Sequence, residues 1–281
     1  MGKYFGTDGF RGEANVTLTA DHAYQVGRFL GWYCGECKRR GGDSEPAKVV
    51  IGKDTRRSSY MFEYALASGL VASGADAYLL HVTTTPSVSY VARTEGFDCG
   101  IMISASHNPF YDNGIKLIGR SGEKMDEDTI ALIEDYLDGK LSVFGQTWET
   151  LPLAQRDHIG RTVDWSAGRN RYVGYLISLG MFSFKGKKVG LDCANGSAWM
   201  IARSVFDALG ATTSSWAMSQ TASISTTAWA PLISRPCSAS WWRKAWTWAL
   251  PTTATRIGAW RWTKRARSSP ATTSCIFAAA I

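Results

Sequence analysis

Acidic residues are absent from the last part of this 281-residue sequence, which has no aspartate or glutamate after Asp207. The segment 214–281 instead holds eight of the 31 basic residues and eight of the 12 tryptophans. The first 213 residues therefore carry 23 basic and 24 acidic residues, and the formal net charge of +7 comes from the C-terminal segment alone. Basic residues interleaved with aromatic ones can bind single-stranded nucleic acid, but this segment has neither helical nor strand periodicity. We predict no nucleic-acid partner, and a nucleic-acid-binding tail remains the last alternative.

Cysteines and long apolar runs are also scarce. Six cysteines are too few for a disulfide scaffold. The lone CxxC of Cys34 and Cys37 has no second pair at zinc-ligand spacing, so we interpret both as helix cysteines. No apolar run approaches the ~18 residues of a membrane span, and no signal-like segment precedes the first glycine-rich motif. We expect a cytoplasmic protein with no membrane partner, and the sequence leaves its oligomeric state open.

What the sequence does contain is an alternation of strand and helix patterns. Strands are expected after the N-terminus and at 48–51, 77–80 and 101–103, and helices at 21–39, 59–73, 87–94 and 126–137. Such alternation is typical of an α/β fold with helices on both faces of a mixed sheet. We predict an α/β domain over residues 1–140 and a linker over 141–160. An incomplete second α/β domain over 161–213 then has a helix at 168–179, a strand at 188–192 and a helix at 197–209.

The most informative segment is 100–109 (GIMISASHNP), and we expect 112–116 (DNGIK) to close the loop that it forms. It is typical of a buried strand that ends in a polar loop, because Pro109 has no N–H to continue a ladder. Ser106 is expected at the tip of that loop. A serine hydroxyl there, beside His107 and ten residues before Lys116, has the groups that phosphoryl transfer needs. The residues alone favour an ordinary strand-end turn, because Ser, Asn and Pro are all common turn residues.

This loop resembles the active-site loop of the α-D-phosphohexomutases, and residues 5–12 (FGTDGFRG) are similar to the opening motif of that family. The amino-acid sequence of the opening motif is most similar to that of the branch that acts on glucosamine phosphates. The resemblance covers residues 1 to about 213, and it includes 52–56 (GKDTR), 85–86 (TP) and 192–196 (DCANG). It implies a phosphohexomutase-type α/β domain followed by an incomplete second one.

The resemblance also implies roles for four side chains. Ser106 would carry the transferred phosphate, and Arg11 would be an active-site cation near it. Lys116 would assist proton transfer to or from the sugar hydroxyl, although a strand-end lysine is otherwise usually solvated. His107 would orient the phosphoserine or move a proton, and a hydrogen-bonded structural histidine is an equal alternative.

Two further motifs are expected to have structural roles. Asp54 and Arg56 would form an ion pair or hold the loop, and Thr85 with Pro86 would shape a neighbouring turn.

The implied reaction is the reversible conversion of glucosamine 6-phosphate to glucosamine 1-phosphate, with these sugar phosphates as the small-molecule partners. The implied cofactor is Mg²⁺, bound by the phosphate on Ser106 and by three loop aspartates. Two alternatives remain: a mutase for mannose or glucose phosphates, and a non-catalytic sugar-phosphate-binding fragment.

The three aspartates are missing because the segment 214–281 has the pattern of a shifted reading frame. If each true codon joins the last base of one codon to the first two bases of the next, residues 252–258 (TTATRIG) can encode YDGDADR. That string is the metal-binding loop of the resembled family. Residues 241–249 (WWRKAWTWA) can likewise encode VVEKGLDVG, a helix end that enters a strand. We therefore predict a non-native tail over 214–281 and expect this exact chain to lack mutase activity.

Overall fold

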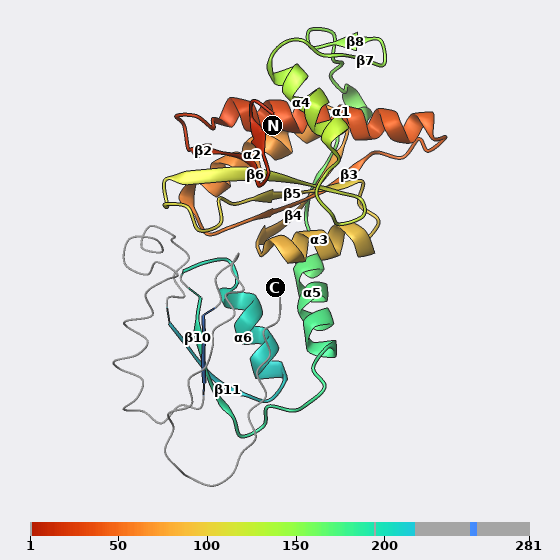
Figure 1. Ribbon diagram of the computed structural model, residues 1–281. Helices are drawn as coiled ribbons and strands as arrows, with labels where there is room; N and C mark the ends of the chain where they lie inside the picture. Colours follow the sequence, from red (N-terminus) through yellow and green to blue (C-terminus); the bar gives the residue numbers. More distant parts are fainter. Residues whose placement is uncertain (1, 194, 217–247, 252–281) are drawn as a thin grey trace.

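The computed structural model describes residues 2–193, 195–216 and 248–251. Its first unit is built on a seven-stranded sheet with the order β1-β2-β6-β5-β3-β4-β9 (Figure 1). These strands are β1 (Phe5–Gly6), β2 (Gly9–Glu13), β3 (Lys48–Lys53), β4 (Asp76–Val82), β5 (Cys99–Ile103), β6 (Asp112–Gly119) and β9 (Thr162–Asp164). The strands β5, β3, β4 and β9 run parallel to one another. The other pairs are antiparallel: β6 pairs with β5, β2 with β6, and β1 with β2.

Helices cover both faces of this sheet. The helices α1 (Ala20–Arg40), α2 (Arg57–Ala72) and α4 (Glu127–Leu137) lie on one face, and α3 (Thr85–Thr94) lies on the other, with α5 (Ser166–Ser178) beside it (Figure 1). The expected α/β fold with a mixed sheet is thereby confirmed. None of the helices in the described ranges is both long and apolar enough to cross a membrane.

The side chains of the central strands alternate between two buried clusters. In β3, Val49 and Ile51 belong to the cluster beneath α1 and α2, whereas Val50 belongs to the cluster beneath α3. In β5, Ile101 and Met102 divide in the same way. This period of two, with apolar residues on both sides of the strands, follows from burial on both faces.

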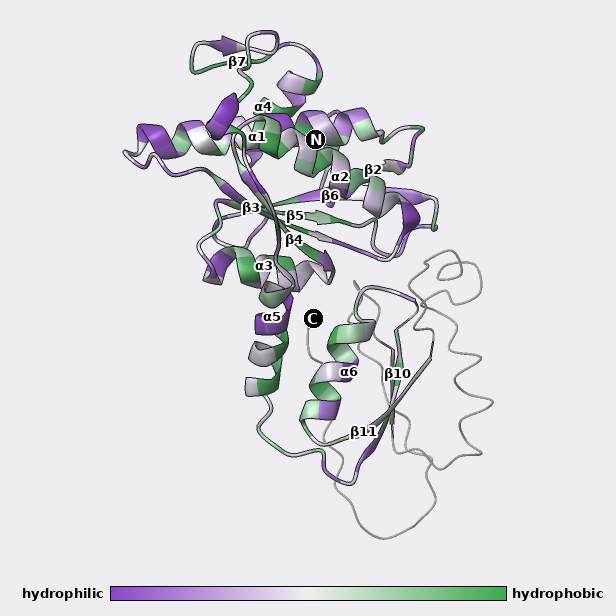
Figure 2. Cartoon of the chain, turned by 180° about the vertical axis from the view of Figure 1, so that it is seen from behind, coloured by the Kyte–Doolittle hydropathy of each residue, from purple (hydrophilic) through white to green (hydrophobic). Residues whose placement is uncertain are grey.

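The sequence has stabilising residues at both ends of the helix α1. Thr19 caps its N-terminus by accepting a hydrogen bond from the backbone N–H of His22, at 3.3 Å. Its last turn carries Lys38, Arg39 and Arg40, which suit the negative end of the helix dipole. This hydrophilic end of α1 is purple in Figure 2.

The second unit is a three-stranded parallel sheet with the order β11-β10-β12. The central strand β10 (Lys188–Asp192) lies between β11 (Thr212–Trp216) and β12 (Trp248–Pro251). The helix α6 (Trp199–Ala208) packs Ala202 against Val189 and Leu191 of β10. Residues 248–251 of the predicted non-native tail thus form an edge strand. The rest of the tail beyond residue 216, including 252–258, lies outside the described residues, and the shifted frame stays a prediction.

Two parts of the sequence fold differently from the expectation. Residues 112–116 do not close a loop but begin β6, which pairs with β2 and β5. The segment 141–160 contains the hairpin strands β7 (Ser142–Val143) and β8 (Gln146–Thr147) and a 3₁₀ turn at Arg156–His158. The hairpin turn has positive φ at both Phe144 and Gly145, as a type I′ turn requires. Since β9 pairs with β4, the first sheet extends beyond residue 140.

Two glycines allow α1 and α2 to cross closely. A Cβ at Gly27 would collide with the carbonyl oxygen of Leu66, and a Cβ at Gly69 would collide with that of Tyr24. Backbone atoms cannot move away as a flexible side chain can, so these positions require glycine.

We therefore predict that Gly27→Ala destabilises the protein by about 1–3 kcal/mol through overpacking. Gly35→Ala is the matched control in the same helix, because a Cβ at Gly35 meets nothing within 4 Å. It should instead stabilise the protein by up to ~1 kcal/mol, since alanine favours helix. Urea unfolding of both variants checks this, and an equal effect of the two substitutions would contradict the close crossing.

Candidate active site

The candidate site lies where the parallel strands β5, β3 and β4 end. Because these neighbours run in the same direction, the segments that follow them meet at one edge of the sheet. The Ser106 loop follows β5, and residues 54–56 follow β3. Ligands bind at the carboxyl ends of the strands in open α/β sheets.

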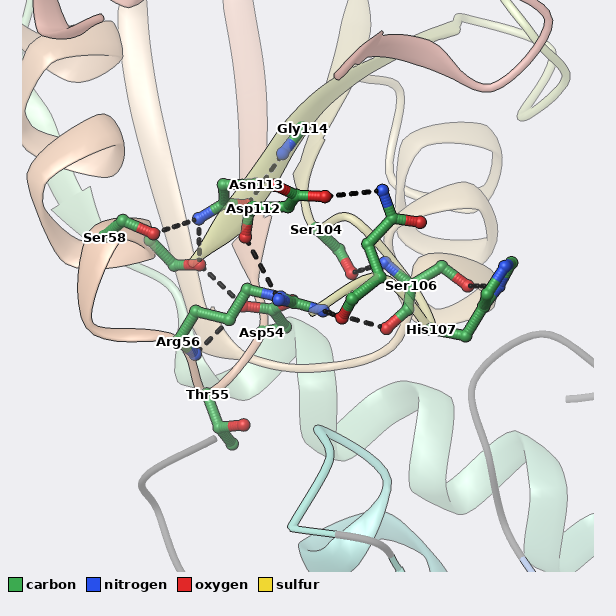
Figure 3. Close-up of polar contacts among 12 residues, drawn as sticks. Asp54, Thr55, Arg56, Ser58, Ser104, Ser106, His107, Asp112, Asn113 and Gly114 are labelled. Atoms are coloured by element: carbon green, nitrogen blue, oxygen red, sulfur yellow. Dashed lines mark hydrogen bonds and ion pairs between the residues drawn. The ribbon is translucent and has the colours of Figure 1, made fainter. Parts of the chain in front are cut away.

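Ser106 has a left-handed backbone conformation, with φ of +59°. Its N–H donates to Ser104 Oγ at 3.0 Å, and its own Oγ lies 3.3 Å from Nδ1 of the exposed His107 (Figure 3). Positive φ is uncommon for a residue other than glycine and marks a position that the surroundings determine. The hydroxyl is therefore delivered by a specific loop conformation.

The buried side chain of Arg56 spans the base of this loop (Figure 3). Its Nη2 donates to the carbonyl oxygens of Ser106 at 3.0 Å and of Asn108 at 2.9 Å. Its Nη1 donates to the carbonyl oxygens of Pro109 and, at 3.0 Å, of Asp112. Its Nε donates to Asp54 Oδ2 at 2.9 Å, so the expected ion pair is confirmed.

A second set of polar contacts fixes the start of β6. The Nδ2 atom of buried Asn113 donates to the hydroxyls of Ser58 and Ser59, and its Oδ1 accepts from the N–H of Gly114 (Figure 3). A Cβ at Gly114 would lie 2.8 Å from the carbonyl oxygen of Ser104. Glycine leaves room for this close approach, and the backbone N–H of Ser104 donates to the carbonyl oxygen of Gly114 at 2.8 Å.

Arg11 approaches the loop from β2. Its Nη1 donates to Asn108 Oδ1 at 3.4 Å, and its Nη2 pairs with Asp8 Oδ2 at 3.1 Å. The amide of Asn108 in turn donates to Asp112 Oδ2 at 2.9 Å. The sequence-predicted cation thus contacts the loop that bears Ser106.

Lys116 lies inside β6, opposite Met102 of β5, rather than at a strand end. It is half-buried. Burial lowers the pKa of Lys116, and the positive charge of Arg11 lowers it further. A lysine whose pKa is lowered toward the working pH is better suited to proton transfer.

The edge also contacts the second unit. Thr55, between Asp54 and Arg56, donates from Oγ1 to the carbonyl oxygen of Asn195 at 2.6 Å. Asn195, which belongs to the segment 192–196 singled out in the sequence, therefore lies beside the candidate site. The motif of Thr85 and Pro86 begins α3, where Pro86 occupies the first turn and its missing N–H costs nothing.

The model of the phosphoglucomutase/phosphomannomutase α/β/α domain I matches residues 2–142, which is half of the chain. The chain belongs to the phosphoglucomutase/phosphomannomutase family. The expected resemblance is thereby confirmed.

Curated relatives extend this similarity over 213 residues. The chain is 72% identical to a phosphoglucosamine mutase of Lachnospira eligens and 66% identical to one of Lachnoclostridium phytofermentans. Each alignment covers 76% of this chain, but only 45% and 44% of the respective relatives. The chain thus spans less than half the length of these relatives.

Solved structures share the fold. A phosphoglucomutase/phosphomannomutase family protein of Burkholderia thailandensis has a TM-score of 0.61 at 24% identity, covering 79% of this chain and 45% of that one. The phosphoglucomutase parafusin of Paramecium has a TM-score of 0.51 at 22% identity, covering 75% and 42%.

Family membership implies a divalent metal ion, but the described residues do not fit one on their own. Residues 2–193, 195–216 and 248–251 contain no group of three or more His, Cys, Asp or Glu side chains that could hold a metal. The carboxylates near the loop are engaged elsewhere, since Asp112 accepts from Asn108 and Asp54 accepts from Arg56.

We predict that the Arg11→Gln variant raises the pKa of Lys116 but leaves it below its ordinary value, because burial is the larger cause. The pKa is measured by NMR titration of the Lys116 side chain. Arg57→Gln, which removes an exposed arginine at the start of α2, is the matched control and should leave it unchanged. An unaltered pKa in Arg11→Gln would show that the charge of Arg11 does not reach Lys116.

Proposed function

We propose that the protein to which this chain corresponds interconverts glucosamine 6-phosphate and glucosamine 1-phosphate through a phosphoserine at Ser106. The observation that carries the proposal is that hydrogen bonds fix the loop that bears Ser106. Arg56 donates to the carbonyl oxygens of Ser106 and Asn108, and Arg11 donates to the side chain of Asn108. The relatives named phosphoglucosamine mutase support the choice of an amino sugar.

The proposed reaction has two transfers of the same kind. In the first, the P–O bond to Ser106 Oγ breaks while a bond forms from the sugar hydroxyl oxygen to the same phosphorus. The sugar hydroxyl loses its proton, and Ser106 Oγ takes one up to become a hydroxyl again. The sugar bisphosphate then reorients, and the P–O bond of its other phosphate breaks as that phosphoryl group is transferred to Ser106 Oγ. The Ser106 hydroxyl loses its proton in this step, and the sugar oxygen takes one up.

Three side chains assist these transfers in the proposal. Arg11 stabilises the negative charge on the moving phosphoryl oxygens. Lys116, with its lowered pKa, exchanges the proton with the sugar hydroxyl. His107 orients the phosphoserine through the contact between its Nδ1 and Ser106 Oγ.

We infer that the metal of the whole protein is Mg²⁺, which would neutralise phosphate charge. Besides phosphorylated Ser106, its ligands would be the three aspartates that the shifted codons at 252–258, outside the described residues, can encode. No step above depends on that ion.

Two other functions stay open within this proposal. The family includes mutases for mannose and glucose phosphates, and the sugar-recognising part of a full-length relative would decide between them. A non-catalytic sugar-phosphate-binding fragment is favoured by one observation, which is that the chain spans only about 45% of its relatives. We place the protein in the cytoplasm.

With the reading frame restored, Ser106→Ala should abolish nearly all formation of glucosamine 1-phosphate, because the phosphoryl carrier is lost. The assay supplies glucosamine 6-phosphate, Mg²⁺ and a sugar bisphosphate primer. Ser121→Ala, at an exposed serine in the turn after β6, is the matched control and should retain activity. Normal turnover by Ser106→Ala would overturn the assignment.

The 281-residue chain should bind Mg²⁺ only weakly even with phosphate on Ser106, because a Mg²⁺ site needs several oxygen ligands. The restored protein should bind it more tightly and gain turnover together with the metal. Calorimetric titration of Mg²⁺ into both proteins measures the difference. Equal, tight binding would show that the metal site lies outside residues 252–258.

A further inference from the structure

We propose that Arg56 is a positioning residue that holds the Ser106 loop in the conformation that transfers phosphate, without contacting the substrate. The catalytic part of this inference rests on the proposed function above.

The contacts of Arg56 converge on the backbone of a single loop. Its two terminal nitrogens donate to four carbonyl oxygens, which belong to Ser106, Asn108, Pro109 and Asp112. One guanidinium thus joins both sides of the loop to the end of β3. A planar group with five donors in fixed directions can satisfy such a set, whereas the single ammonium of lysine cannot reach all of it.

Arg56 acts through geometry rather than through its charge. Its side chain is only 4% exposed, which excludes direct contact with a sugar phosphate. Its charge is balanced by Asp54, which is also buried and which accepts from the N–H of Arg56 and from the hydroxyl of Ser59. The buried pair therefore offers directed hydrogen bonds and little net field.

One of these bonds is to Ser106 itself. A φ of +59° is unfavourable for serine, so the loop needs contacts that favour this conformer over a relaxed one. The bond from Arg56 Nη2 to the Ser106 carbonyl oxygen, at 3.0 Å, acts on the backbone of the residue that would carry the phosphate. Loss of the guanidinium should leave the hydroxyl present but misplaced.

The first test measures loop order in the 281-residue chain and does not depend on function. In hydrogen–deuterium exchange, Arg56→Lys should exchange at least about tenfold faster in peptides covering residues 104–112, with β4 and α1 unchanged. Arg57→Lys, at the neighbouring exposed arginine, should match the wild type. Unchanged exchange in the loop, or equally faster exchange throughout the first unit, would overturn the proposal. If Arg56→Lys does not fold, Asp54→Asn replaces it and is expected to loosen the same peptides.

The second test measures catalysis in the full-length protein with the frame restored. Arg56→Lys should lower kcat on the order of 10²-fold, as misplacement of a reacting group does, and should leave KM unchanged. In Arg56→Gly, methylguanidinium should restore turnover and methylammonium should not, because only the former supplies the forked donors. A loss confined to KM, or equal rescue by both cations, would overturn the positioning role. If the wild-type protein itself shows no mutase turnover, the proposed function fails while the exchange result still decides whether Arg56 orders the loop.

Discussion

The candidate site depends on one constraint, which is that β3 pairs in parallel with both β4 and β5. Parallel neighbours end at the same edge, so segments about fifty residues apart in sequence become adjacent there. The bond from the N–H of Asp54 to the carbonyl oxygen of Ile103, at 2.9 Å, already joins the ends of β3 and β5. The other contacts of the site depend on that adjacency. They include the bond from the Arg56 guanidinium to the loop and the bond from the Thr55 hydroxyl to Asn195 of the second unit.

The buried charged side chains at this edge of the sheet form ion pairs. Lys53, the last residue of β3, pairs with Glu63 of α2, and the next two charged residues along the chain, Asp54 and Arg56, pair with each other. A buried charge without a partner is costly, and removing one member of a buried pair is strongly destabilising. Since Glu63 and Ser59 both belong to α2, that helix holds the polar edge as well as covering the sheet.

Much of this architecture follows from the sequence. Apolar runs and helix signals located the helices to within a few residues, as in α3, expected at 87–94 and found at Thr85–Thr94. The sequence gives no strand signal for β6 because Asp112, Asn113 and Lys116 make its start polar. The side-chain hydrogen bonds that satisfy Asp112 and Asn113 there are made with residues outside β6, and only the folded structure shows them. The strand β9 has three residues and no periodicity to detect. The carbonyl acceptors of Arg56 left no signal either, because every residue has a carbonyl and only the fold decides which ones converge.

The left-handed backbone at Ser106 restricts the kind of residue that can stand there. Serine and threonine offer the same hydroxyl chemistry, and either could in principle accept a phosphoryl group. The two substituents on the Cβ of threonine make a φ near +60° a true outlier, whereas serine tolerates it. At this loop the backbone conformation, rather than the reactivity of the hydroxyl oxygen, favours serine over threonine.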